Sequence, residues 1–264
     1  MSVVVPAYNE EAGIAELVGE LTARLDAFAR PYEILVVDNA STDGTVDVLQ
    51  PLLDGGRVRL LRNDVNRGKG FSVRRGMLNV GGELRLLCDA DCGPSLVSLP
   101  HMLDAIEGLD VVAGSRVADG AKVDRQQPLR RRIVGWPFIA LTRIIMLEPT
   151  RDVYCGFKLW RARAADAVFP RQRLTGWAFD AEVLALARRL GFRVGEVGVE
   201  WADRRGSKLS IAQVLVPAVR ELLAARRNVR AQAHSGAARA DPPADPDDVG
   251  ADAQLVADSA ERGA

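Results

Sequence analysis

Short apolar runs that end in polar residues are the feature that most constrains this fold. Five such runs occur in the N-terminal half of the chain. Amphipathic helical patterns lie between them, for example at Ile14 to Phe28 and at Val73 to Asn79. Strands that alternate with helices predict an α/β domain with a mainly parallel sheet and right-handed crossovers. The predicted strands are residues 2–5, 33–37, 58–61, 84–88 and 110–114.

Polar, ligand-like residues follow four of these five strands. The carboxyl ends of parallel strands meet at one edge of a sheet, where α/β proteins bind ligands. Asp89-Ala90-Asp91 comes directly after the strand at 84–88. Two carboxylates at this spacing can meet one hard cation, and Mg²⁺ or Mn²⁺ commonly bridges protein carboxylates to substrate phosphates. The pair therefore predicts a metal–diphosphate site, with an ordinary polar turn as the alternative.

Several ordered motifs carry a resemblance to a known family. VVVPAYNE, VVDNASTDGT, NRGKG and DADCGP occur in that order, followed by DVYCGFKLW, GWAFDAEVL and VEWADRRGSKL. The first four resemble the inverting glycosyltransferases of family 2 with the GT-A fold, a Rossmann-like sheet with flanking helices. The last three resemble the polyprenyl-phosphate glycosyltransferases, and most of all the dolichyl-phosphate β-glucosyltransferases, with the dolichyl-phosphate mannose synthases close by. The resemblance covers roughly residues 2 to 228.

The resemblance implies an inverting transfer of a sugar, glucose from UDP-glucose in the first instance, to a polyprenyl phosphate. It implies Mg²⁺ or Mn²⁺ at Asp89 and Asp91, with Asp91 as the main ligand. GDP-mannose as the donor, a soluble hydroxyl acceptor, and a non-catalytic protein that binds nucleotide sugars remain as alternatives. The residues expected around the nucleotide sugar are Pro6, Tyr8, Glu10, Asp38, Lys69 and Asp89.

Cationic residues further along the chain are candidates for the acceptor phosphate. Guanidinium groups bind phosphate through two parallel hydrogen bonds. The loop at 201–208 carries three cationic residues and is typical of a lid that closes over phosphates. A hydroxyl acceptor would need a general base, for which Asp180 is the candidate, whereas a lipid phosphate is already ionised. The expected acceptor residues are Arg116, Arg131, Lys158, Ser207 and Lys208, and Arg116 and Lys208 are also expected to assist the reaction.

Several of these candidates have a simpler alternative, which is a solvated turn for Lys69 and a charged surface loop for residues 201–208. Asp38 could be a turn acid that caps backbone N–H groups. Lys158 could be the partner of a carboxylate, and it ends a tight loop, 152–158, that leads into a strand. In that loop Gly156 permits a backbone angle that other residues avoid. Asp180 could simply favour the dipole at the start of a helix.

Composition limits the other possibilities. The chain of 264 residues has no net formal charge, but residues 233–264 contain seven acids and two bases. We therefore expect one domain over residues 1–230, with a basic body, and a disordered acidic tail over 231–264. The odd number of cysteines, three, indicates free thiols in a reducing compartment. With only two histidines beside them, the sequence also argues against a zinc site.

The sequence predicts no membrane-spanning helix, because it contains no uninterrupted apolar run of 18 residues. Residues 133–147 follow three arginines and carry Trp136 and Phe138, which is typical of a segment at a membrane surface. A core or dimer helix is the alternative. We expect a peripheral enzyme on the cytoplasmic face of a membrane, with no nucleic-acid partner.

Overall fold

The computed structural model describes residues 1–28, 30–53, 56–123, 139–146, 148–202 and 211–234, with side chains only for 219–232 in the last range. Its strands are β1 (Ser2–Ala7), β2 (Glu33–Asp38), β3 (Val58–Arg62), β4 (Leu84–Cys88), β5 (Val111–Ser115), β6 (Lys122–Val123), β7 (Phe157–Arg161), β8 (Val194–Gly198) and β9 (Glu200–Trp201). Its helices are α1 (Ile14–Ala27), α2 (Thr45–Leu49), α3 (Lys69–Leu78), α4 (Leu99–Ile106), α6 (Ala162–Val168), α7 (Phe179–Arg189) and α8 (Ile211–His234), with short 3₁₀ turns η1 (Gln50–Leu52), η2 (Gly93–Ser98) and η3 (Phe169–Arg171).

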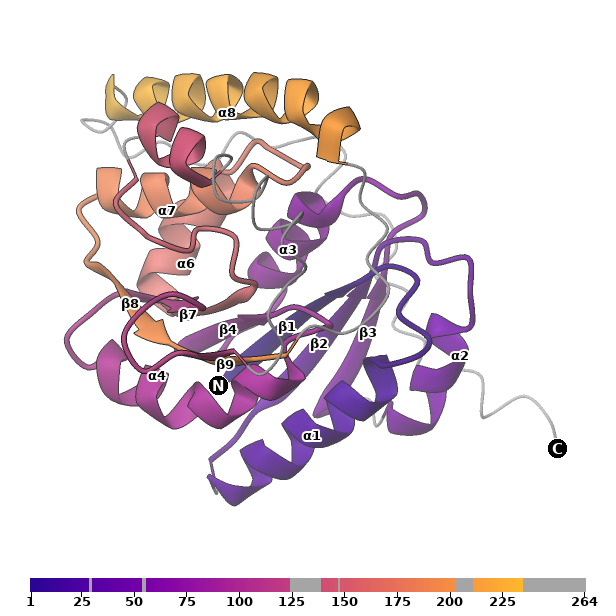
Figure 1. Cartoon of the computed structure of the whole chain (residues 1–264). Coiled ribbons are helices and arrows are strands. Elements are labelled where there is room, and N and C mark those ends of the chain that lie inside the picture. The colour runs from indigo at the N-terminus through magenta and orange to yellow at the C-terminus, as the bar shows by residue number, and fades with distance from the viewer. Residues whose placement is uncertain (29, 54–55, 124–138, 147, 203–210, 235–264) are drawn as a thin grey trace, which may run out of the picture.

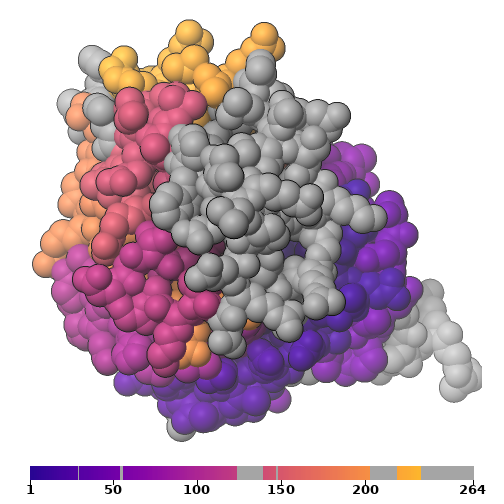
Figure 2. Space-filling view, viewed as in Figure 1, coloured from indigo at the N-terminus to yellow at the C-terminus, as the bar shows by residue number. Residues whose placement is uncertain are grey.

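One seven-stranded sheet forms the centre of the molecule, in the order β3-β2-β1-β4-β7-β5-β8. Its neighbours are parallel except where β7 lies between β4 and β5, antiparallel to both. The short strands β6 and β9 pair separately. In Figure 1, α1, α2 and α4 lie on one side of the sheet, and α3, α6 and α7 lie on the other with α8 outermost. Figure 2 shows the same face, with the N-terminal elements at its base and α8 at its top.

The central strand explains why helices cover both faces. Every residue of β1 is buried. Val3 and Val5 point into the core beneath α1 and α4, whereas Val4 points into the core beneath α3 and α7. Side chains alternate along a strand, so a strand that is buried at every position must be covered on both faces. The buried residues of α1 recur at helical spacing, at Ile14, Leu17, Val18, Leu21 and Leu25.

The five predicted strands are confirmed as β1 to β5, within two residues at each end, and the strand expected after the loop at 152–158 is confirmed as β7. The predicted helix at Val73 actually begins four residues earlier, at Lys69. Gly70 lowers the helical propensity of this stretch, but a Cβ at Gly70 would crowd the Leu174 carbonyl and the Phe179 ring. Tertiary packing therefore requires glycine within the first turn of α3.

The apolar segment at 133–147 lies only partly within the described residues. Its described part, 139–146, is helical. Thr142 and Met146 are buried, whereas Ile144 is 69% exposed, so the helix contacts the core on one side only. Within the described ranges, no helix has the length and apolar character needed to cross a membrane. Of the predicted acidic tail at 231–264, residues 231–234 belong to helix α8, and the rest lies outside the described residues.

Two glycines within helices provide a matched test of this packing. A Cβ at Gly76, in α3, would overlap the Val4 side chain of the central strand, whereas a Cβ at Gly19, in α1, would meet nothing within 4 Å. We expect Gly76→Ala to lower the free energy of unfolding by about 1–3 kcal/mol through overpacking. Gly19→Ala should raise it by about 0.5–1 kcal/mol, because alanine favours the helix. Urea denaturation of both variants checks the opposite signs; equal effects would contradict the packing of α3 on β1.

Candidate functional site

Most of the predicted site residues that the structure describes gather at the carboxyl edge of β1, β2 and β4, whereas Arg116 follows β5, Lys158 lies on β7 and Asp180 lies in α7. Asp38 is the last residue of β2, Asp89 directly follows β4, and Lys69 is the first residue of α3. Lys69 forms an ion pair with Asp89 and so ties the start of α3 to the end of β4. Burial opposes the charge on Lys69, but Asp89, Asp180 and Asp91 outweigh it and raise the pKa of the ammonium group.

Gly156 lies against the Asp89 carboxylate. Its carbonyl accepts a hydrogen bond from the Asp89 N–H at 2.9 Å, and a Cβ at Gly156 would overlap the carboxylate itself. Gly156 does not use the unusual backbone angle that glycine permits, since its φ does not lie in the left-handed region. Glycine is needed here because backbone and carboxylate approach so closely.

The two carboxylates after β4 fit a divalent cation. Asp89 Oδ1 is buried, and no group of the described residues donates a hydrogen bond to it, so one oxygen of the carboxylate is left unsatisfied. Asp91 is exposed at the surface of the protein. Even so, desolvation by the surrounding protein atoms, and then the negative charge of Asp89, raise the pKa of its carboxyl group. A divalent cation bound here would pair with the unsatisfied Asp89 oxygen, and it would stabilise the ionised form of the Asp91 carboxyl group.

Among the described residues, no group of three acidic, histidine or cysteine side chains could hold a metal. A site with only two carboxylates suits Mg²⁺ or Mn²⁺, which often take their remaining ligands from substrate phosphates and water. The residues present therefore fit a cation that binds together with a diphosphate. Zinc, for which three or four protein ligands are usual, fits less well.

The loops after β1 and β2 are joined by short hydrogen bonds. Asn9, which has a positive φ of 57°, accepts a bond from the Thr42 N–H at 2.8 Å, and the Glu10 N–H donates to Thr45 Oγ1 at 2.8 Å. Pro6 is buried within β1, whereas Tyr8 is 44% exposed at its end. Tyr8 and Glu10 therefore flank a fixed loop at the sheet edge.

Asp38 is fully buried, and its carboxylate accepts hydrogen bonds from the Ser41 N–H at 3.2 and 3.4 Å. Arg62 Nε lies 3.5 Å from the same carboxylate. These contacts are those of the turn-acid alternative. A role for Asp38 toward a nucleotide stays a prediction.

An asparagine cluster that the sequence analysis missed holds the loop before α3. Asn39 Oδ1 accepts hydrogen bonds from Asn63 Nδ2 at 2.9 Å and from the Arg67 N–H at 3.1 Å, and Asn39 Nδ2 donates to Asn66 Oδ1 at 2.8 Å. Asn39 and Asn63 each follow a strand directly, and this shared position is the signal that could have identified them. The cluster fixes the backbone that carries Lys69.

Arg116 is engaged by a carboxylate that the sequence analysis did not assign a role. Its Nε and one terminal nitrogen donate to the two oxygens of Asp152, each at 2.7 Å, and its backbone N–H donates to Asp152 at 2.9 Å. Burial opposes the ionisation of Asp152, but the hydrogen bonds and charge of Arg116 outweigh it and lower the pKa of the carboxyl group. The guanidinium also lies 5.5 Å from the centre of the Trp201 ring. Arg116 is thus held in one orientation.

Lys158 and Asp180 form an ion pair inside the protein. Lys158 Nζ donates to Asp180 Oδ1 at 2.5 Å and to the Cys155 carbonyl at 2.6 Å, and neither residue is more than 1% exposed. Burial raises the pKa of Asp180, although Lys158 and Lys69 act in the opposite direction. Of the two alternatives for Lys158, the structure shows the partner of a carboxylate.

Two further acids, Glu182 and Glu221, anchor the loop before α7. Glu182 Oε2 accepts hydrogen bonds from the backbone N–H groups of Arg173 and Leu174, at 3.1 and 2.9 Å. Glu221, from α8, accepts one from the Ala178 N–H at 3.1 Å. Only their backbone partners reveal this role, so sequence alone carries no signal for it. Arg131, Ser207 and Lys208 lie outside the described residues.

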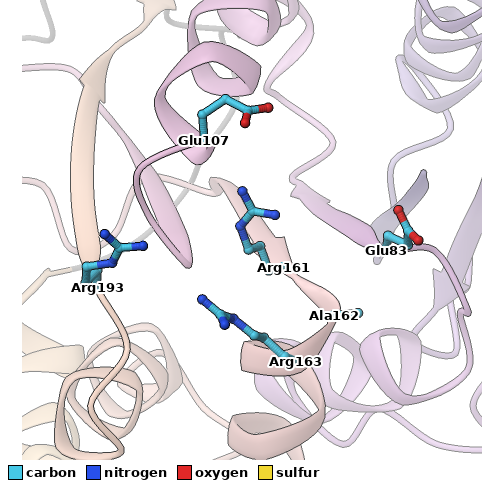
Figure 3. A pocket seen from close by; sticks show the side chains of 6 residues that line it. All are labelled: Glu83, Glu107, Arg161, Ala162, Arg163 and Arg193. Atoms are coloured by element: carbon cyan, nitrogen blue, oxygen red, sulfur yellow. The ribbon is translucent and has the colours of Figure 1, made fainter.

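A cavity of about 460 Å³ lies at the opposite end of the sheet from these residues, near the start of β4 and the end of β7. Figure 3 shows the side chains that line it, which include three arginines and two glutamates. Arg161 donates to the carbonyls of Ile106 and Leu109, at the end of α4, and Arg163 pairs with Asp110. Arg193 Nε lies 3.9 Å from the same Asp110 carboxylate, so all three arginines already have structural partners, and we assign this cavity no ligand.

Comparisons with known proteins agree with this geometry. A family model described as "Glycosyl transferase family 2" matches residues 2–169. The dolichyl-phosphate beta-glucosyltransferase of Dictyostelium discoideum is 31% identical over 79% of this chain and 68% of its own. The corresponding protein of Homo sapiens is 30% identical over 79% and 69%.

Among solved structures, the glucosyl-3-phosphoglycerate synthase of Mycobacterium tuberculosis, in complex with Mn²⁺, UDP-glucose and phosphoglyceric acid, superposes with a TM-score of 0.63. It is 19% identical, and the match covers 85% of this chain and 78% of that one. At this identity the likeness shows a shared fold.

The buried ion pair gives a direct test of the site's architecture. Lys158→Met should lower the free energy of unfolding by about 3–5 kcal/mol, because it leaves the Asp180 carboxylate buried without a partner. The double variant Lys158→Met/Asp180→Leu should recover most of the loss. Urea denaturation measures both, with Lys122→Met as the control, since the Lys122–Glu200 pair lies on the surface. If Lys158→Met were as stable as the control, the pair would not have the burial described.

Proposed function

The chain belongs to glycosyltransferase family 2, and we propose that it transfers glucose from UDP-glucose to a polyprenyl phosphate such as dolichyl phosphate, with inversion at the anomeric carbon. The observation that carries the donor half is the unsatisfied Asp89 oxygen beside Asp91 and Lys69, at the carboxyl edge of the sheet. The acceptor half is supported by relatives named dolichyl-phosphate beta-glucosyltransferase, which match about four fifths of this chain.

The residues around Asp89 suit a diphosphate leaving group. Asp89 and Asp91 would hold Mg²⁺ or Mn²⁺, and the bound cation would offset the negative charge that develops on the departing diphosphate. Lys69, whose pKa is raised chiefly by Asp89 in spite of burial, keeps a positive charge beside the same position. Pro6, Tyr8, Glu10 and Asp38 would surround the nucleoside on the strands nearest to Asp89.

The state of Asp180 supports a phosphate acceptor. In the transfer, an acceptor oxygen forms a bond to the anomeric carbon while the bond from that carbon to the diphosphate breaks. A hydroxyl acceptor must also lose a proton to a base. Asp180 is buried and bonded to Lys158, so it is poorly placed to receive that proton. An ionised lipid phosphate needs no base, and Asp180 then orients Lys158.

The acceptor phosphate requires cations rather than a base. Arg116 lies at the end of β5 and remains partly exposed after its bonds to Asp152. We propose that Arg131, Ser207 and Lys208 complete the binding of the acceptor phosphate. Lys158 would contribute through its positive charge from inside the protein. A lipid acceptor also implies a peripheral position on a membrane, for which we propose the cytoplasmic face.

Transfer of radiolabelled sugar tests this function. UDP-glucose with Mg²⁺ or Mn²⁺ and polyprenyl phosphate in detergent should give an organic-extractable, acid-labile product. Asp91→Ala should lower the rate at least about a thousandfold, because it removes a ligand of the cation. The exposed acid Asp104, on α4, provides the control, and Asp104→Ala should keep the full rate.

The alternatives give different results in the same assay. Product from GDP-mannose and not from UDP-glucose would replace the proposed donor. Donor hydrolysis that requires Asp91, without a lipid product, would favour a soluble hydroxyl acceptor. Full activity of Asp91→Ala, or of the wild type in excess chelator, would contradict the metal site.

A further inference from the structure

Trp177 is an unusual residue in the candidate site because it is large, apolar and 47% exposed. Its ring centre lies 5.7 Å from Lys69 Nζ, which is the same ammonium group that pairs with Asp89. Phe179, two residues further on, also lies near Lys69 but is fully buried. Trp177 is therefore an aromatic surface directly beside the proposed diphosphate position.

The loop that carries Trp177 is fixed on both sides. On one side, the Thr175 carbonyl accepts a hydrogen bond from the Gly70 N–H at 2.8 Å. On the other side, Glu221 of α8 accepts the bond from the Ala178 N–H. The exposure of Trp177 is thus a property of a loop held at the residues that flank it.

Two close approaches confirm how tightly this loop is placed. A Cβ at Gly68, whose φ is +92°, would overlap the Thr175 carbonyl, and a Cβ at Gly176 would overlap the Glu221 carboxylate. The loop at 175–178 therefore packs closely against the start of α3 on one side and against α8 on the other. An indole that is presented in this way contributes little to the core, and it leaves an aromatic face open to a ligand beside Lys69.

We propose that the indole of Trp177 packs against the hexose ring of the donor and so distinguishes a sugar nucleotide from the free nucleotide. The sugar is bonded to the diphosphate, so a diphosphate held beside Lys69 and Asp89 brings the sugar within reach of Trp177. The C–H groups on the face of a hexose are apolar, and an aromatic ring is the side chain that covers them without a desolvation cost. This inference rests on the proposed function, whose donor it describes in more detail.

Binding measurements without acceptor test the contact. Titration calorimetry with Mg²⁺ should show that Trp177→Ala weakens UDP-glucose binding about tenfold and changes UDP binding less than about twofold. Trp177→Phe should keep most of the affinity for UDP-glucose, since it retains an aromatic face. The control is Phe28→Ala, which removes an exposed aromatic side chain at the end of α1, and it should bind both ligands as the wild type does.

A second measurement does not depend on the alanine variant folding. In the wild type, UDP-glucose should change the tryptophan fluorescence more than UDP does, and Trp177→Phe should abolish that difference. Equal weakening of both ligands by Trp177→Ala would instead assign Trp177 to the nucleotide or to loop stability, and unchanged binding of both would place it outside the donor site. Either result overturns the inference while the proposed function stands. Failure of the wild type to bind UDP at all would contradict the proposed function and the inference together.

Discussion

The position of β7 is the constraint on which the rest of the site depends. This strand enters the sheet between β4 and β5 and runs antiparallel to both, with Phe157 opposite Cys88. Its beginning therefore lies at the carboxyl end of β4, and this places Gly156 against the Asp89 carboxylate. The same strand carries Lys158 into the core, where it meets Asp180 at the start of α7. Because β7 runs antiparallel to β4, residues from the second half of the sequence lie against the Asp89 carboxylate, which belongs to the first half.

Charge balance around this point is a consequence of that geometry. Lys69 pairs with Asp89, Lys158 with Asp180, and Arg116 with Asp152. Each cation is oriented by a carboxylate that is itself largely buried. Fixed charges of this kind need no reorganisation when a charged substrate arrives, which is how electrostatic catalysis is most effective. Asp91 is the carboxylate outside these three pairs, and it faces solvent where a cation can approach.

Much of this organisation could be predicted from the sequence, because it depends on local patterns. Apolar runs fixed the strands to within two residues, and the family resemblance is confirmed by the match over residues 2–169. Lys69 and Asp89 were expected in one site, and the structure brings them into contact. The polyanionic donor, the acceptor and the roles of individual site residues stay proposals, as does the domain boundary near residue 230.

The remaining features depend on contacts between residues far apart in the sequence. Nothing local indicates that Asp152 orients Arg116, since the two are joined only when β5 and the loop before β7 come together. At Gly156, likewise, glycine is required by a neighbouring carboxylate and not by its own φ angle. Similarly, glycine at position 70, which local propensity disfavours within a helix, is explained by the distant residues Leu174 and Phe179 that pack on it.

The central claim is that Asp89 and Asp91 bind a divalent cation together with a nucleoside diphosphate. Electron paramagnetic resonance of Mn²⁺ measures this most directly, because the free ion gives a sharp signal that weakens on binding. We expect protein alone to take up little Mn²⁺, protein with UDP to take up about one ion per chain, and Asp91→Asn to lose this uptake. Uptake that is independent of UDP, or unchanged in Asp91→Asn, would contradict the claim.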